Sequence, residues 1–195
     1  GAWLRIGAAP ALHLTLRATL REGAQEMIAA LQARGAELHL LSGDTPAATR
    51  AVADELGLST FHASQSPADK IAYLNALAAQ GHKVLMVGDG LNDTGALASA
   101  YASVAPAAAA DAARAASDVV LLGRSLAPLP DLIDTAQKAK RRILENFAIA
   151  AGYNALVIPL ALAGFVTPLL AAIAMSSSSI TVLLNALRLT RRAGP

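Results

Sequence analysis

The sequence of 195 residues contains no cysteine and no initiating methionine. Without thiols the chain can form neither a disulfide nor a thiolate metal site, so any metal it binds must use other ligands. No secretory signal peptide stands at the N-terminus. These absences lead us to expect a fragment of a longer protein.

Charge is also scarce, because only 15% of residues are charged while 54% are hydrophobic. The shortage is concentrated in residues 147–166 and 169–187, which contain no charged residue at all. Each run is close to the ~20 residues that span a bilayer core. Only Thr167 and Pro168 separate them. The sequence therefore predicts a transmembrane helix hairpin over 147–189, preceded by a connecting helix over 126–146.

Basic residues flank both apolar runs, although the formal net charge is only +2. They are Lys138, Lys140, Arg141 and Arg142 before the first run, and Arg188, Arg191 and Arg192 after the second. Such charges are typical of the cytoplasmic side, so we expect both hairpin ends and a tail over 190–195 to be cytoplasmic. Because they do not interleave with aromatic residues, we expect no nucleic-acid partner.

The first two thirds of the chain have an α/β pattern. Residues 36–122 alternate short apolar runs with helical patterns, which is typical of a parallel, Rossmann-like sheet with crossover helices. The predicted strands are 37–43, 59–63, 83–90 and 117–122, and the predicted helices are about 23–34, 46–56, 67–80 and 92–100. The alanine-rich stretch 105–116 is compatible with either a loop or a helix. Residues 1–125 are thus the predicted soluble domain.

Three polar segments follow predicted strands, and in such sheets the active site lies at the carboxyl ends of the strands. Ser42, Gly43 and Lys70 can serve phosphoryl chemistry, since a phosphoryl group in transfer needs hydrogen-bond donors and positive charge. Taken singly, Ser42 is explained as a turn hydroxyl and Lys70 as a solvated lysine. Their occurrence in order, together with a third segment, favours a functional site.

The third segment is GDGLND at residues 88–93. Asp89 and Asp93 supply the carboxylate oxygens that Mg²⁺ prefers. Gly88 and Gly90 let the backbone approach the ion and a phosphate closely. Asn92 is placed to orient a water or a carboxylate. The segment predicts a magnesium site beside the phosphate site.

These motifs resemble a known family. The segments SGD at 42–44, P-x-D-K at 67–70 and GDGLND resemble the haloacid dehalogenase superfamily, and more closely the phosphorylation domain of P-type cation-transporting ATPases. The resemblance covers residues 20–195. The segments GYN at 152–154, M-x-x-SS at 175–179 and NALRL at 185–189 are similar to the last two transmembrane helices of the heavy-metal subclass.

The resemblance implies a role for each matching residue. Ser42, with Gly43 and Asp44, would bind the phosphoryl group, Lys70 would stabilise it, Asp89 would be the main Mg²⁺ ligand, and Asn92 and Asp93 would support the site. On the copper-type metal pathway the matching residues are Tyr153, Asn154, Met175, Ser178 and Ser179. A thioether is a soft ligand suited to Cu(I), which agrees with a metal role for Met175. The ordinary alternatives are that Met175 only fills space in the packing and that the serines only allow close helix packing.

Parts of the family pattern are absent. No Asp-Lys-Thr-Gly-Thr segment with the nucleophilic aspartate occurs, nor do a Cys-Pro-Cys helix, a nucleotide-binding domain or a dephosphorylating domain. The sheet would therefore lack the strand that carries the nucleophile. Thr94-Gly95 stands where the family usually has proline, and Ala18 where it usually has aspartate.

The leading hypothesis is the C-terminal portion of an ATP- and Mg²⁺-dependent pump for Cu(I) or another heavy metal. The pump would lie in the bacterial plasma membrane, and its remaining domains would be the partners of this chain. The alternatives are a membrane-anchored haloacid dehalogenase-type phosphatase and a non-catalytic, truncated membrane interaction protein.

Overall fold

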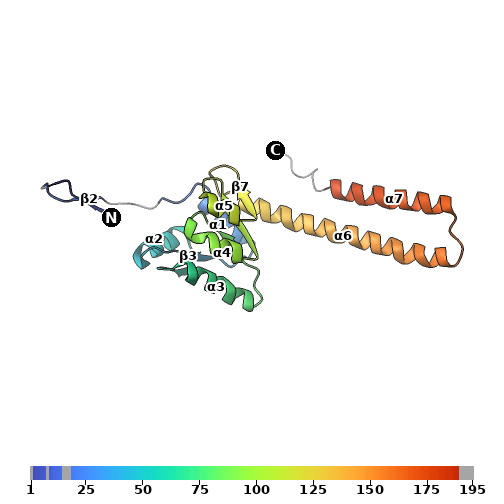
Figure 1. Cartoon of the computed structure of the whole chain (residues 1–195), viewed down its shortest axis with the longest axis horizontal. Coiled ribbons are helices and arrows are strands. Elements are labelled where there is room, and N and C mark those ends of the chain that lie inside the picture. Colours follow the sequence, from blue (N-terminus) through green and yellow to red (C-terminus); the bar gives the residue numbers. More distant parts are fainter. Residues whose placement is uncertain (1, 8, 15–18, 189–195) are drawn as a thin grey trace. The chain divides into compact units, whose positions relative to one another are not determined.

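A computed structural model describes residues 2–7, 9–14 and 19–188 (Figure 1). Ala18 and the predicted tail over 190–195 lie outside the described residues. The chain divides into two compact units, Gly1–Pro130 and Asp131–Pro195. The boundary between them lies near the start of a long helix.

The first unit carries seven strands and five α-helices within its described residues. The strands are β1 (Ala2–Leu4), β2 (Leu12–Leu14), β3 (His39–Leu41), β4 (Thr60–His62), β5 (Leu85–Val87), β6 (Ala102–Pro106) and β7 (Val119–Leu121). The helices are α1 (Ala24–Ala33), α2 (Pro46–Leu56), α3 (Pro67–Ala79), α4 (Thr94–Ser99) and α5 (Asp111–Ala116). Strands β1 and β2 form an antiparallel hairpin that is not among the predicted elements.

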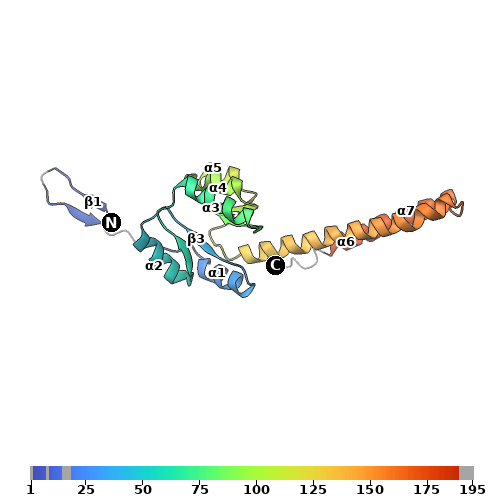
Figure 2. The same cartoon turned by 90° about the horizontal axis from the view of Figure 1, so that it is seen from below.

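The parallel strands form two separate sheets. Strand β3 pairs with β4, and β5, β6 and β7 pair in that order, all in parallel. Figure 2 shows α1 and α2 on one side of the strands and α3, α4 and α5 on the other. The predicted parallel α/β class is confirmed. Strand β3 and strand β5 each have one edge that pairs with no other described strand.

Strand β6 corrects the sequence analysis, which left 105–116 open and placed no strand over 102–106. Ser103, Val104 and Ala105 are at most 1% exposed, so β6 is the buried centre of its sheet. Ala105 packs in the core cluster with Leu74 and Leu97, from helices α3 and α4. Of the predicted strand over 117–122, only Val119–Leu121 forms β7, and Val120 within it is 37% exposed.

Local caps explain where two crossover helices begin. The Thr45 hydroxyl accepts a hydrogen bond from the N–H of Ala48 at the start of α2. At α3, Ser66 and Asp69 form a capping box, in which each side chain bonds the other residue's backbone N–H. Proline at the first helical position adds a preset backbone angle in both helices. The predicted starts at 46 and 67 are confirmed.

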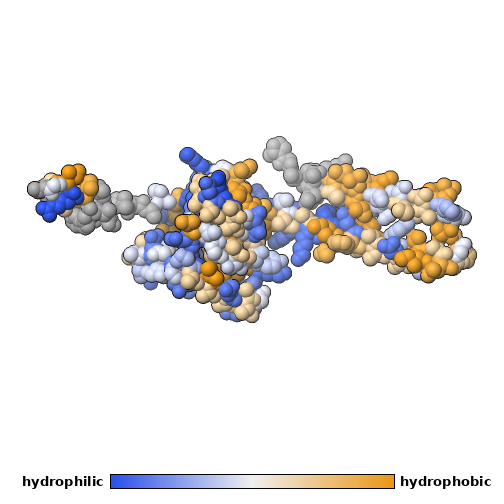
Figure 3. Space-filling view, viewed as in Figure 1, coloured by the Kyte–Doolittle hydropathy of each residue, from blue (hydrophilic) through white to orange (hydrophobic). Residues whose placement is uncertain are grey.

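The second unit is a helix hairpin. Helix α6 (Leu129–Leu162) runs unbroken for 34 residues, and α7 (Pro168–Leu187) for 20. Both are long and apolar enough to cross a membrane, and apolar side chains cover most of the hairpin in Figure 3. Thr167 caps α7 through the N–H of Leu170. The connecting helix and the first predicted span are thus one helix, and residues 163–166 belong to the turn.

Candidate functional site

The GDG turn follows β5 directly and is shaped by its glycines. Residues Leu91–Asp93 form a 3₁₀ turn, so α4 begins at Thr94 and not at the predicted residue 92. A Cβ atom on Gly88 would lie 2.9 Å from the Cβ atom of Asp93, closer than packed atoms allow. The N–H of Gly90 donates to Oδ2 of Asp93 at 3.3 Å. The two glycines therefore let Asp93 fold back against the turn.

Lys70 and Asp93 form the central ion pair of the site. The Nζ atom of Lys70, from the first turns of α3, lies 2.6 Å from Oδ1 of Asp93. Their side chains are 10% and 14% exposed. A buried lysine needs such a partner, because an unpaired charge in a low-dielectric interior is costly. The structure thus brings together two predicted residues that are 23 positions apart.

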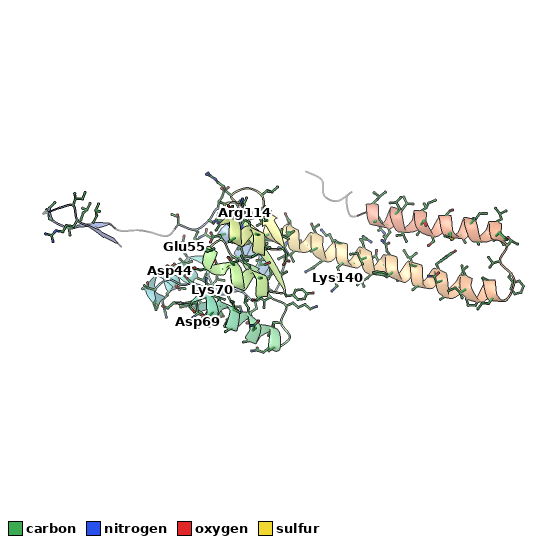
Figure 4. The ribbon with its side chains drawn as sticks, in the orientation of Figure 1. Asp44, Glu55, Asp69, Lys70, Arg114 and Lys140 are labelled. Carbon is green, nitrogen blue, oxygen red and sulfur yellow. The ribbon has the colours of Figure 1, made fainter. Side chains whose placement is uncertain are left out.

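The SGD turn after β3 is fastened to the chain segment that leads into α3. The Ser42 hydroxyl accepts the N–H of Asp44 at 3.1 Å, which makes a tight serine turn. The N–H of Ser42 donates to the carbonyl of His62, and the N–H of Gln65 donates to the carbonyl of Ser42, both at 2.9 Å. These bonds connect the turn to α3, on which Figure 4 labels Asp69 and Lys70.

The capping box at the start of α3 also lowers the pKa of one of its members. The Ser66 hydroxyl donates to Oδ2 of Asp69 at 2.6 Å, and the N–H of Ser66 donates to the same oxygen at 2.9 Å. These two bonds stabilise the charged form and hold the pKa of the Asp69 carboxyl below its ordinary value. The box fixes the helix end that carries Lys70.

Asp89 forms an ion pair that the sequence analysis did not predict. The guanidinium of Arg21 lies 2.6 Å from Oδ2 of Asp89, with the two side chains 29% and 55% exposed. Arg21 precedes α1 and is 68 residues from Asp89, so no local spacing connects them. No motif in the sequence marked Arg21 as a site residue. Asn92 is exposed on the 3₁₀ turn.

The donors in this turn suit Mg²⁺. Asp89 offers a partly exposed carboxylate and Asp93 a second one in the same glycine-shaped turn. Mg²⁺ binds through one or two carboxylates and retains several waters, so two carboxylates are a sufficient protein contribution. Among the described residues, no cluster of three or more histidine, aspartate or glutamate side chains has the arrangement of a closed metal cage.

The residues of the predicted metal pathway differ in their exposure within the hairpin. Tyr153 and Ser178 are half-buried. Asn154, Met175 and Ser179 are exposed, Met175 to 66%. The described interhelical hydrogen bonds of the hairpin involve Asn185 and none of these five residues.

Comparison with known proteins identifies the homologues of the chain. Residues 8–100 match the haloacid dehalogenase-like hydrolase family. The chain is 49% identical over 175 residues to the nitrogen fixation protein FixI of Bradyrhizobium diazoefficiens, covering 90% of this chain and 24% of that protein. It is 41% identical to a copper-exporting P-type ATPase of Mycobacterium leprae, covering 87% of this chain and 22% of that protein.

A solved structure extends the match through the hairpin. A zinc-transporting PIB-type ATPase in the E2.Pi state is 35% identical, with a TM-score of 0.82 over 89% of this chain and 28% of that one. The homologues of this chain are heavy-metal P-type ATPases. The match corresponds to their C-terminal phosphorylation domain and membrane helices, and the chain spans about a quarter of the curated relatives' length. The two apolar helices and this similarity support an integral membrane protein.

Proposed function

We propose that the chain is the C-terminal part of an ATP-driven heavy-metal pump that exports Cu(I) through an aspartyl-phosphate cycle. One observation carries the assignment as a pump: a single structural match, with a TM-score of 0.82, spans both the α/β domain and the membrane hairpin. A phosphatase with an unrelated anchor would be expected to match over the soluble domain alone. The match through both helices therefore favours a pump.

In this proposal the residues of the first unit bind and neutralise the phosphoryl group. The Ser42 hydroxyl and the N–H of Gly43 donate hydrogen bonds to its oxygens. The Nζ atom of Lys70 carries the compensating charge and is held in place by Asp93 at 2.6 Å. Asp44 holds the serine turn through its N–H bond to Ser42, and Asn92 on the exposed 3₁₀ turn orients a water.

Asp89 and Asp93 would hold the magnesium ion, with Gly88 and Gly90 leaving room for it and for the phosphate. The ion would offset the negative charge of the transferring group. The Asp89 carboxylate reaches this role only when the guanidinium of Arg21 has moved away from it, since the two groups are 2.6 Å apart here. Asp93 would serve both the lysine and the ion.

The nucleophilic aspartate would come from the remaining domains of the same pump. The sheet supports this arrangement, because β3 and β5 are parallel strands that each leave one edge without a described partner. A strand placed there would end among the SGD and GDG turns, at the carboxyl ends of its neighbours. The sequence itself contains no Asp-Lys-Thr-Gly-Thr segment.

Copper is proposed from the chemistry of the membrane residues. Met175 presents a thioether on the exposed face of α7, and thioethers select Cu(I) over harder ions. Tyr153, Asn154, Ser178 and Ser179 would line the same pathway, together with helices outside this chain. Basic residues at both hairpin ends support a cytoplasmic location for those ends, in a bacterial plasma membrane.

Reading the coding sequence upstream of Gly1 tests the proposal directly. We expect an in-frame Asp-Lys-Thr-Gly-Thr segment and a Cys-Pro-Cys in an earlier apolar run. A stop codon just upstream would instead support the truncated interaction protein, and an Asp-x-Asp-x-Thr segment without further membrane helices would support the phosphatase.

Activity of the full-length pump then tests the residues. We expect Met175→Leu to reduce Cu(I)-stimulated ATP hydrolysis, whereas Met27→Leu in the core of α1 serves as the control for a lost thioether. Asp89→Asn should abolish Mg²⁺-dependent phosphoenzyme formation, and Asp111→Asn on the exposed start of α5 should not. ATP hydrolysis that responds to Zn²⁺ and not to Cu(I) would overturn the copper assignment.

A further inference from the structure

Both carboxylates of the GDG turn are paired with a cation of the chain itself. Oδ1 of Asp93 lies 2.6 Å from Nζ of Lys70, and Oδ2 of Asp89 lies 2.6 Å from Nη2 of Arg21. Two carboxylates in one short turn repel each other when no counter-charge faces them. The chain therefore supplies, through two side chains, the same positive charge that a divalent cation would bring.

The two ion pairs differ in their exposure to solvent. The side chains of Lys70 and Asp93 are 10% and 14% exposed, whereas those of Arg21 and Asp89 are 29% and 55% exposed. A buried pair is costly to separate, because each charge would be left without compensation. A pair in contact with solvent separates at little cost. A cation that enters the turn from solution would therefore displace Arg21 and leave Lys70 in place.

The backbone that carries Arg21 is fixed, so its side chain cannot go far. The carbonyl of Arg21 accepts the N–H of Ala24 at 3.0 Å. Gly23 has a φ of +73° and packs so closely that an added Cβ would lie 2.7 Å from the backbone nitrogen of Ala127. A guanidinium that leaves its carboxylate thus remains tethered beside it, at a high effective concentration.

The backbone of Asp89 is fixed as well. Its carbonyl accepts the N–H of Ala110, at the start of α5, at 3.0 Å. The GDG turn is therefore held in place by a bond that does not involve the carboxylate. One partly exposed carboxylate is available to two cations, of which one is attached to the chain and the other comes from solution.

We propose that Arg21 competes with Mg²⁺ for Asp89, so that it weakens the binding of the ion and is released when the ion binds. This inference rests on the proposed function, in which Asp89 is a ligand of Mg²⁺, and it adds a residue that sets the apparent affinity for that ion. Arg21 acts through Asp89 and is a positioning residue. Binding of the ion and release of the guanidinium are linked, so each affects the other by the same factor.

The size of the effect follows from the exposure of the pair. The apparent affinity of a ligand is reduced by the fraction of molecules whose site is free to receive it. For an exposed ion pair this fraction is about one sixth to one half. Arg21→Gln replaces the guanidinium with a neutral amide, and we expect it to lower the dissociation constant of Mg²⁺ by about two- to sixfold.

Urea unfolding of the full chain in nonionic detergent, followed by pulse proteolysis, measures Mg²⁺ binding without turnover. A ligand of the folded state raises the unfolding midpoint as its concentration passes its dissociation constant. The titration uses MgCl₂ at constant ionic strength, and each variant is compared with its own Mg²⁺-free midpoint. Asp89→Asn should abolish the Mg²⁺ effect. Arg114→Gln removes a guanidinium that is paired with Asp111 on α5, and it should leave the dissociation constant within about 1.5-fold.

Chemical modification tests the reciprocal effect. Phenylglyoxal modifies guanidinium groups, and mass spectrometry of the digested chain measures the rate at each arginine. Saturating Mg²⁺ should raise the rate at Arg21 by the same two- to sixfold, about the increase in its free fraction. Arg50, whose guanidinium lies 5.4 Å from the centre of the Phe61 ring, should react at the same rate with and without Mg²⁺.

The outcomes separate this inference from the proposed function. An unchanged or weaker Mg²⁺ affinity in Arg21→Gln would overturn the competition, and so would an unchanged rate of modification at Arg21. The absence of any Mg²⁺ effect in both the wild type and Arg21→Gln would also overturn it. A Mg²⁺ effect that needs Asp89 but does not respond to Arg21→Gln would leave the magnesium ligand standing. A full-length pump that forms no phosphoenzyme would refute the proposed function and leave the competition at Asp89 standing.

Discussion

Replacing Lys70 with methionine tests whether the ion pair with Asp93 organises the site. In the folded domain the Nζ atom lies 2.6 Å from Oδ1 of Asp93, and the two side chains are 10% and 14% exposed. Lys70→Met keeps most of the side-chain volume and removes the charge. The Asp93 carboxylate then retains the N–H of Gly90 at 3.3 Å as its described donor.

The magnitude follows from the burial of the pair. Removing one partner of a buried ion pair leaves a charge without compensation and costs about 3–5 kcal/mol. Lys70→Met with Asp93→Asn removes both charges, so most of that loss should be recovered. The double variant would nevertheless lack the lysine that the proposed phosphoryl site requires. Stability and activity should therefore separate in this variant.

Pulse proteolysis in urea, with the full chain in nonionic detergent, measures the free energy of unfolding of the soluble domain. Arg114→Met is the matched control, because it breaks an ion pair with Asp111 at exposed positions. An exposed pair contributes only about 0–1 kcal/mol. A Lys70→Met variant that loses no more stability than Arg114→Met would refute the reasoning, and so would a double variant that is less stable than Lys70→Met.

Two further perturbations test the packing and the cap of the domain. Gly23→Ala should destabilise the domain by about 3 kcal/mol or more. A residue with a Cβ in the left-handed conformation costs about 1–2 kcal/mol, and this Cβ would also lie 2.7 Å from the backbone nitrogen of Ala127. Gly35 has a similar φ but open space around it. Gly35→Ala should therefore cost only the conformational term of about 1–2 kcal/mol in the same urea assay. The pKa of Asp69 is lower in the folded chain. The contribution of Asp69 to folding stability is therefore fully present above the ordinary pKa of about 3.9. It disappears as the pH falls through the pKa of the folded state. Ser66→Ala should therefore make stability less dependent on pH in this acid range, and an unchanged acid profile would contradict the role of the cap.

Much of the fold could be predicted because its signals are local. Proline and hydroxyl caps mark the starts of α2 and α3, and charge-free runs mark the hairpin. Strand β6 was not predicted, because its residues are small and form no clear apolar run. It is recognised by its burial between two neighbouring strands, which a local stretch of sequence does not show. The sequence also did not indicate that α6 is one continuous helix, because its charged and apolar parts were predicted as two separate elements.

The candidate site was predictable to the extent that its residues stand in short motifs. Lys70 and Asp93 were expected at neighbouring strand ends, and their ion pair is observed. The contact of Arg21 with Asp89 depends on how the segment before α1 returns to the GDG turn, over 68 positions. The hydrogen bonds of Asn185 to Glu145 and Asn146 likewise join segments about 40 residues apart. Packing of the whole chain decides which distant segments come into contact, and the spacing of residues in a single sequence does not reveal these contacts.

The division of the sheet has a consequence for how the protein is assembled. Strands β3 and β5 each present backbone donors and acceptors along one edge, and such edges accept any strand of suitable direction. Backbone pairing requires no covalent link between the partners. If the proposed nucleophile strand pairs at one of these edges, we expect a peptide that carries it to complete the domain in trans, so that two separately synthesised halves would reconstitute one domain.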